Sequence, residues 1–223
     1  MEKLVAVVLM AGLSTRFGGP KNKQLCLLNG KPVFTYAIDA FAKHKAVNEL
    51  IIAVNNDNKA EIEKYVKENL YNAKIIMGGT TRQESVDNAL KTLSLAENDI
   101  VIIHDGARPL VDERIIDDVA KAASDCGAST AYLEAIDTIA VKNEKDEIVE
   151  FVDRKTVAQI QTPQGFKYGL LKKAHEVEEK DATDDCSLIL KLGNKVKLVK
   201  GDKKFHKITT IEDIKYLEGL LKQ

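Results

Sequence analysis

The sequence has few cysteines, no excess charge of one sign and no long apolar run, and each absence excludes a class of protein. Its three cysteines, Cys26, Cys126 and Cys186, are widely spaced and form no C-x-x-C pair. This spacing argues against a disulfide framework or a zinc site and indicates a reducing compartment. Lys and Arg (33) nearly balance Asp and Glu (34), so the chain has no excess positive charge with which to bind nucleic acid nonspecifically.

The apolar run at residues 4–13 is too short to span a bilayer. It has only Lys3 as a basic flank and no small-x-small cleavage site, so it predicts a buried strand rather than a signal peptide. We therefore expect a cytoplasmic protein that has neither a membrane nor a nucleic acid as its partner.

What the sequence does contain is a regular alternation of apolar strands and amphipathic helices. Its 223 residues, 44% apolar and 30% charged, suffice for a continuous core, and we expect a single domain over residues 1–223. Strands are predicted at residues 4–10, 50–54, 74–77, 99–103, 129–133 and 195–199. Helices are predicted from residue 32, at 58–70, 82–93, 112–126 and 168–179, and from about 184 and 211. The alternation indicates an α/β fold with an open, mostly parallel sheet and helices on both faces.

Residues 137–154 break this alternation. Two short apolar runs, 138–141 and 148–152, flank the polar turn 142–147 and predict a hairpin. Two readings remain open: a projecting β-arm that packs against a second subunit, or a hairpin that lies on its own domain.

The loop from Ala11 to Gln24 is the most informative stretch for function. It follows a buried strand, and ligands of such sheets bind beyond the carboxyl ends of the strands. Its glycines permit a close approach of the backbone to phosphate oxygens, and Arg16, Lys21 and Lys23 add positive charge. The spacing matches neither a P-loop nor G-x-G-x-x-G. We therefore expect a nucleoside triphosphate site of another kind.

The motif Ala11-Gly12-x-x-x-Arg16, followed by Lys23-Gln24, is similar to the signature of sugar-phosphate nucleotidylyltransferases. Further motifs follow along the chain: Gly78-Gly79-x-x-Arg82-x-x-Ser85, His104-Asp105-x-Ala107-Arg108-Pro109, Asp137-Thr138, Val152-Asp153-Arg154, Gln161-Thr162-Pro163-Gln164, Thr183-Asp184-Asp185 and Lys207-Ile208-Thr209. From end to end they resemble the 2-C-methyl-D-erythritol 4-phosphate cytidylyltransferases of isoprenoid precursor synthesis. The resemblance implies a Rossmann-like nucleotidyltransferase fold and the transfer of CMP from CTP to that sugar-alcohol phosphate, with release of pyrophosphate.

The resemblance also implies a role for each motif. The catalytic residues would be Arg16, Lys23, Asp105 and Lys207. CTP would be bound by Ala11, Gly12, Gly79, Arg82 and Ser85. The acceptor would be bound by Asp105, Arg108, Thr138, Arg154, Thr162, Thr183 and Lys207. Thr138 and Arg154 would reach the neighbouring subunit's site from the arm at about residues 137–154, which implies a homodimer.

The expected chemistry is a displacement in which the acceptor's phosphate oxygen attacks the α-phosphorus of CTP. A phosphate monoester is already an anion at neutral pH, so no general base is needed, and the barrier is the meeting of two anions. Mg²⁺ or another divalent cation, held mainly by the CTP phosphates with Asp105 as its candidate protein ligand, would offset that repulsion together with the basic residues. His104 is expected to be structural.

Three alternatives remain from the sequence. Ribitol-5-phosphate cytidylyltransferases share the fold, CTP and most motifs, and Thr-Asp-Asp-Cys at residues 183–186 departs from the usual Thr-Asp-Glu-Ala beside the acceptor. A guanylyltransferase of the molybdenum-cofactor kind is suggested by residues 11–18, but it has no evident need for the arm. A catalytically dead nucleotide sensor is disfavoured because the basic residues and Asp105 are retained together.

Overall fold

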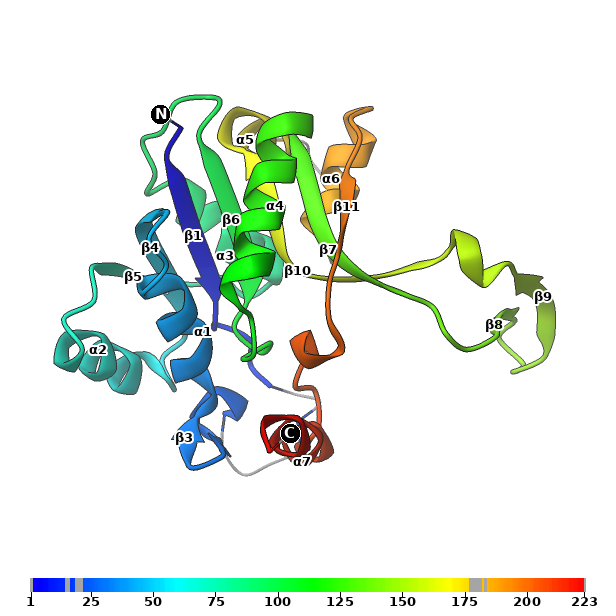
Figure 1. Ribbon diagram of the computed structural model, residues 1–223, viewed down its shortest axis with the longest axis horizontal. Coiled ribbons are helices and arrows are strands. Elements are labelled where there is room, and N and C mark those ends of the chain that lie inside the picture. Colours follow the sequence, from blue (N-terminus) through cyan, green and yellow to red (C-terminus); the bar gives the residue numbers. More distant parts are fainter. Residues whose placement is uncertain (1, 15–16, 19–21, 177–181, 183, 223) are drawn as a thin grey trace.

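A computed structural model describes residues 2–14, 17–18, 22–176, 182 and 184–222, and its centre is one twisted sheet (Figure 1). The strands of this seven-stranded sheet are, in spatial order, β11 (Lys197–Lys200), β7 (Ala128–Glu134), β10 (Ala158–Lys167), β6 (Ile100–Asp105), β1 (Leu4–Leu9), β4 (Val47–Val54) and β5 (Ala73–Met77). Every pairing is parallel except the two made by β10. The predicted α/β fold with a mostly parallel sheet is confirmed.

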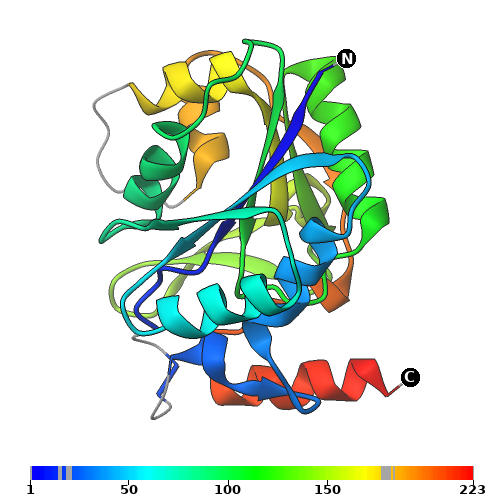
Figure 2. The same cartoon turned by 90° about the vertical axis from the view of Figure 1, so that its left-hand side faces the viewer.

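Helices cover both faces of the sheet (Figure 2). They are α1 (Val33–Ala42), α2 (Lys59–Glu68), α3 (Arg82–Leu90), α4 (Glu113–Cys126), α5 (Tyr168–His175), α6 (Asp185–Lys191) and α7 (Ile211–Leu221). Alternate residues of β1 divide the core, because successive side chains of a strand point to opposite faces. Ala6 and Val8 join the cluster under α1, α2 and α4, whereas Val5 and Val7 join the cluster under α3, α5 and α6. None of the described helices is long and apolar enough to cross a membrane.

The sequence did not predict strand β10, which lies antiparallel between β6 and β7. Its central residues are polar or are Pro163 and Gly165, a composition that disfavours a strand. The strand nevertheless buries Gln161, Thr162 and Gln164, and this polar stretch runs next to the carboxyl end of β6. It therefore brings hydrogen-bonding side chains to the edge of the sheet where a ligand is expected.

The predicted hairpin is present and consists of β8 (Ile139–Lys142) and β9 (Ile148–Val152). These strands form a sheet of their own, and Figure 1 shows them well away from the central sheet on two extended connections. The reading in which the hairpin lies on its own domain is wrong for this chain. Large apolar side chains of this arm are exposed, including Ile148 (62%), Val149 (59%) and Phe151 (66%).

A third apolar cluster ties the chain's C-terminal part to the segment after β1. The cluster joins Ile208, Ile214 and Leu217 to Leu28 and Val33. Leu28 belongs to β2 (Leu27–Leu28), which pairs with β3 (Lys31–Pro32) in a small hairpin, and Val33 directly follows β3. The backbone N–H of Ile208 also donates to the carbonyl of Ala107, 2.8 Å away. Residues 207–209 are thereby fixed beside the loops that follow β1 and β6.

Candidate active site

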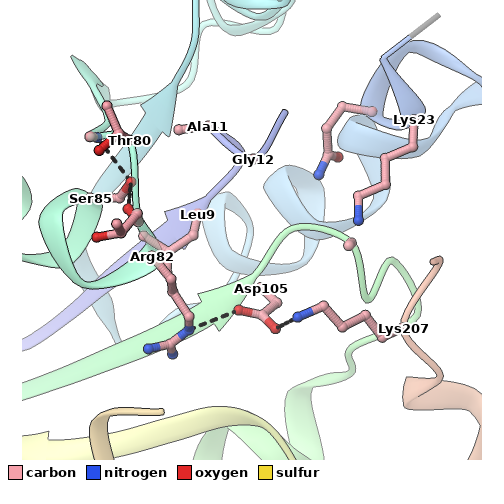
Figure 3. A pocket seen from close by; sticks show the side chains of 13 residues that line it. Leu9, Ala11, Gly12, Lys23, Thr80, Arg82, Ser85, Asp105 and Lys207 are labelled. Carbon is pink, nitrogen blue, oxygen red and sulfur yellow. Dashed lines mark hydrogen bonds and ion pairs between the residues drawn. The ribbon is translucent and has the colours of Figure 1, made fainter. Parts of the chain in front are cut away.

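A cavity opens at the carboxyl ends of β1 and β6, where Leu9 and Asp105 are register partners. It collects most of the residues predicted to bind CTP or to act in catalysis (Figure 3). The predicted site residues that line it are Ala11, Gly12, Lys23, Gly79, Arg82, Ser85, Asp105 and Lys207. They come from four separate stretches of chain, so the fold alone brings them together.

One wall of the cavity is the turn between β5 and α3. A Cβ atom on Gly78 would lie 2.2 Å from the Cβ of Ala11, so only glycine allows this turn to approach the segment after β1. Thr81 and Glu84 form a capping box at the start of α3: Thr81 Oγ1 accepts from the N–H of Glu84, whose carboxylate accepts from the N–H of Thr81. Ser85 Oγ accepts from the N–H of Gly79 at 3.0 Å. The turn is thus rigid before any ligand arrives.

Asp105 lies on the cavity's inner wall between two cations (Figure 3). One carboxylate oxygen accepts from Lys207 Nζ at 2.6 Å, and the other lies 3.4 Å from Arg82 Nε. The side chain is mostly buried, and burial alone would raise its pKa. The positive charges of Arg82, Lys207 and Arg108 outweigh that effect and lower the pKa of Asp105 well below its ordinary range. Asp105 is therefore ionised at neutral pH.

Arg82, the first residue of α3, directs its guanidinium at protein acceptors from three elements. It donates to Asp185 at 2.6 Å and to Gln164 at 3.4 Å in addition to Asp105. Burial would lower the pKa of Arg82, but Asp185 and Asp105 raise it above the ordinary value. The side chain is held as a charged group at the floor of the cavity.

Lys23 reaches the opposite side of the cavity from the short 3₁₀ turn Lys23–Leu25. Its ammonium donates to the carbonyl of Ile208 at 2.9 Å, next to Lys207. The loop after β1 and the C-terminal segment are therefore joined directly at the site, and they present two ammonium groups to the same space.

A second cavity adjoins the first, and Lys207 lines both. Its other lining residues include Arg108, Gln161, Lys203, His206 and Thr209. Arg108 donates to the carbonyl of Phe205 at 2.7 Å, but its buried Nε has no partner. Among the described residues, no carboxylate lies within ion-pair distance of Arg108. A half-buried guanidinium that carries no carboxylate bond and has a free Nε–H is suited to an anionic ligand.

Thr162 does not line either cavity, although the sequence predicted it to bind the acceptor. It is buried, and its hydroxyl accepts from the N–H of Asp105 at 3.0 Å. The same hydroxyl lies 3.2 Å from His104 Nδ1, and His104 Nε2 lies 3.0 Å from the carbonyl of Arg108. Thr162 and His104 therefore support the backbone that carries Asp105 and Arg108.

The remaining predicted residues lie elsewhere. Thr138 and Arg154 belong to the arm and line neither cavity of their own chain. Arg154 donates to the carbonyl of Ile136 at 2.6 Å and borders a separate hollow at the base of the arm. Arg16 and Thr183, together with Lys21, lie outside the described residues.

Sequence reasoning assigned no role to several residues that the fold brings to the site. Asp185 and Gln164 lie 103 and 82 positions from Arg82, and no local spacing links them to it. Lys203 and His206 precede Lys207 in the sequence and line the second cavity, and only their basic side chains could have indicated that they belong to the site.

Comparison with known proteins points to one family. The sequence profile of the 2-C-methyl-D-erythritol 4-phosphate cytidylyltransferase family matches residues 4–223. A protein of that name from Clostridium perfringens is 40% identical over 229 aligned residues, covering 100% of both chains. One from Bacillus mycoides is 38% identical and covers 96% of each chain. A crystal structure of 4-diphosphocytidyl-2C-methyl-D-erythritol synthase from Anaerococcus prevotii superposes with a TM-score of 0.87 at 27% identity, covering 100% of this chain and 99% of that one.

The buried imidazole of His104 gives a prediction for stability. Burial lowers the pKa of His104 from 6.5 to about 4, so the unfolded chain binds a proton at pH 5 that the folded chain does not. Lowering the pH from 7 to 5 should therefore cost the folded state about 2 kcal/mol through this group. Urea unfolding of a His104→Gln variant should show a dependence on pH that is flatter by about that amount. An equally steep dependence would contradict a neutral, structural His104.

Proposed function

The chain belongs to the 2-C-methyl-D-erythritol 4-phosphate cytidylyltransferase family, and we propose how its residues divide the transfer of CMP from CTP between two adjoining cavities. The enzyme joins CMP to the phosphate of 2-C-methyl-D-erythritol 4-phosphate and releases pyrophosphate. The family match favours this acceptor over ribitol 5-phosphate. The observation that carries this proposal is that Lys207 lines both cavities, which supports a role for its ammonium between two anionic substrates.

The cavity at the ends of β1 and β6 takes CTP. Ala11 and Gly12 pass close to the phosphates, and Lys23 neutralises the pyrophosphate as it leaves, with Arg16 of the same loop assigned to the same task. The base lies against the rigid turn that contains Gly79, with Arg82 and Ser85 beside it. The rigid turn supports this assignment because a preformed wall costs little conformational entropy on binding.

The second cavity takes the acceptor. Arg108, whose Nε has no partner, and the adjoining Lys207 bind the acceptor's phosphate. Thr183, which is not among the described residues, is assigned to the same substrate. The acceptor arrives already charged, so these residues act by position and charge, not by removing a proton. Thr162 acts through Asp105 and not by touching the acceptor.

A divalent cation, Mg²⁺ in the first instance, accompanies CTP. The described residues contain no cluster of three or more acidic, His or Cys side chains that could hold a metal without a ligand. The single carboxylate of Asp105 fits Mg²⁺ that arrives with its nucleotide, because Mg²⁺ is usually bound through one or two carboxylates plus substrate phosphates. Each Asp105 oxygen has a further lone pair beyond its bond to Lys207 or Arg82. The bound cation supplies charge neutralisation at the phosphates.

The arm serves a homodimer. We take residues 1–223 as a single domain with the hairpin as its arm. The exposed Val149 and Phe151 of the arm are apolar surface that an isolated two-stranded sheet cannot cover. A second copy of the chain would cover that surface and receive Thr138 and Arg154 beside its acceptor cavity. The wide spacing of the three cysteines, with no C-x-x-C pair, supports a reducing, cytoplasmic location.

The acceptor assignment has a direct test. We expect release of pyrophosphate from CTP to require a divalent cation and to be fastest with 2-C-methyl-D-erythritol 4-phosphate, compared with ribitol 5-phosphate, glycerol phosphate and no acceptor. A coupled pyrophosphate assay measures all four. Faster turnover with ribitol 5-phosphate would overturn the acceptor, and no turnover with any acceptor would overturn catalysis.

The dimer is tested by weakening the apolar face of the arm. A Val149→Ser/Phe151→Ser double variant should sediment as a monomer and lose most of its activity, because Arg154 no longer reaches a neighbouring site. Leu70→Ser is the matched control, since Leu70 is an exposed leucine (91%) away from the arm. A wild-type protein that sediments as an active monomer would contradict the role of the arm.

A further inference from the structure

A buried histidine, His175, lies behind the CTP cavity at the end of α5. Its side chain is only 4% exposed and does not line the cavity. Nδ1 lies 2.5 Å from a carboxylate oxygen of Asp87 on α3, and Nε2 lies 2.9 Å from a carboxylate oxygen of Asp185 on α6. The ring therefore joins three helices that meet on this face of the sheet.

The partners of His175 decide its protonation state. An ionised carboxylate accepts hydrogen bonds and cannot donate them, so both ring nitrogens must carry a hydrogen. Only the imidazolium satisfies both bonds at once. Burial would lower the pKa of His175, but the bonds and charges of Asp185 and Asp87 outweigh it and raise the pKa above the ordinary value. The cation is thus built into the geometry of the three side chains.

Asp185 connects this cation to the active site. Its side chain is 1% exposed, and its two oxygens are divided between His175 Nε2 and Arg82 NH1, the latter 2.6 Å away. Arg82 in turn contacts Asp105. A buried carboxylate between two cations is stable only while both remain charged and in place.

We propose that the His175 imidazolium is a positioning residue for CTP binding, because it fixes Asp185 and Asp185 fixes the guanidinium of Arg82. This inference rests on the proposed role of Arg82 beside the nucleotide base. His175 itself touches neither substrate. It acts on the reaction only through the orientation of Arg82.

The proposal predicts a dependence on pH with a definite sign. When His175 loses a proton, one ring nitrogen becomes an acceptor that faces a carboxylate, and that hydrogen bond is lost. The arrangement that holds Arg82 is therefore intact below the pKa of His175 and weakens as the pH rises through it. The KM for CTP should rise over that range, while turnover at saturating CTP changes less.

The test uses Asp87→Asn, which removes one carboxylate from His175 without touching Arg82. The loss of that charge should lower the pKa of His175, because Asp87 no longer stabilises the imidazolium. The alkaline fall of kcat/KM for CTP should move to lower pH by the same amount, with near wild-type activity at pH 6. The chain has 4 histidines, so the His175 ring resonance can be followed by NMR and assigned by its absence in His175→Gln.

Asp117→Asn is the matched control, because it also removes a carboxylate that lies beside a buried histidine: Asp117 is 3.3 Å from His44. His44 lies just before β4, at the amino end of that strand and away from the cavity at the carboxyl ends. The control variant should leave the profile unchanged. The proposal is overturned if the resonance of His175 titrates below pH 6.5, or if it moves in Asp87→Asn while the kinetic profile stays in place. Arg82→Lys, measured in parallel, distinguishes a failure of the proposed role of Arg82 from a failure of the role of His175. If Arg82→Lys leaves the KM for CTP unchanged, the role of Arg82 is wrong whatever His175 does.

Discussion

The active site depends on one buried carboxylate that must be paired. An isolated charge in a protein interior is costly, and Asp105 offsets that cost only through its bonds to Lys207 and Arg82. Each partner comes from a different part of the chain, so the pairing fixes α3 and the C-terminal segment against the end of β6. The same electrostatic requirement that stabilises Asp105 therefore sets the positions of two cations that line the cavity.

The wider fold supplies what this pairing needs. Parallel strands end together at one edge, so the loops after β1, β5 and β6 meet there, and Gly78 allows the turn after β5 to approach closely. The polar strand β10 adds Gln164 beside Arg82 and Thr162 beneath Asp105, and Ile208 anchors the segment that carries Lys207. These contacts shape the two cavities that we propose for the donor and the acceptor.

The sequence predicted those parts of the structure that have a local signal. Buried strands such as β1 and the capping box at Thr81 follow from short-range patterns, and the motif order indicated the family before the fold was known. Strand β10 was missed because its buried stretch is mostly polar and contains one large apolar side chain, Phe166. The link from Arg82 through Asp185 to His175 was also missed, because Arg82 and Asp185 lie 103 positions apart and no local spacing connects them.

The central claim is that Lys207 acts where the two substrates meet. It is tested most directly by comparing turnover with CTP affinity in Lys207→Met, with Lys204→Met as the matched control because Lys204 pairs with Asp112 and lines neither cavity. We predict that Lys207→Met loses about 10²–10³-fold in kcat while its affinity for CTP changes only a few-fold, and that Lys204→Met resembles the wild type. A loss of turnover matched by an equal loss of CTP affinity, or an equal defect in both variants, would contradict the account.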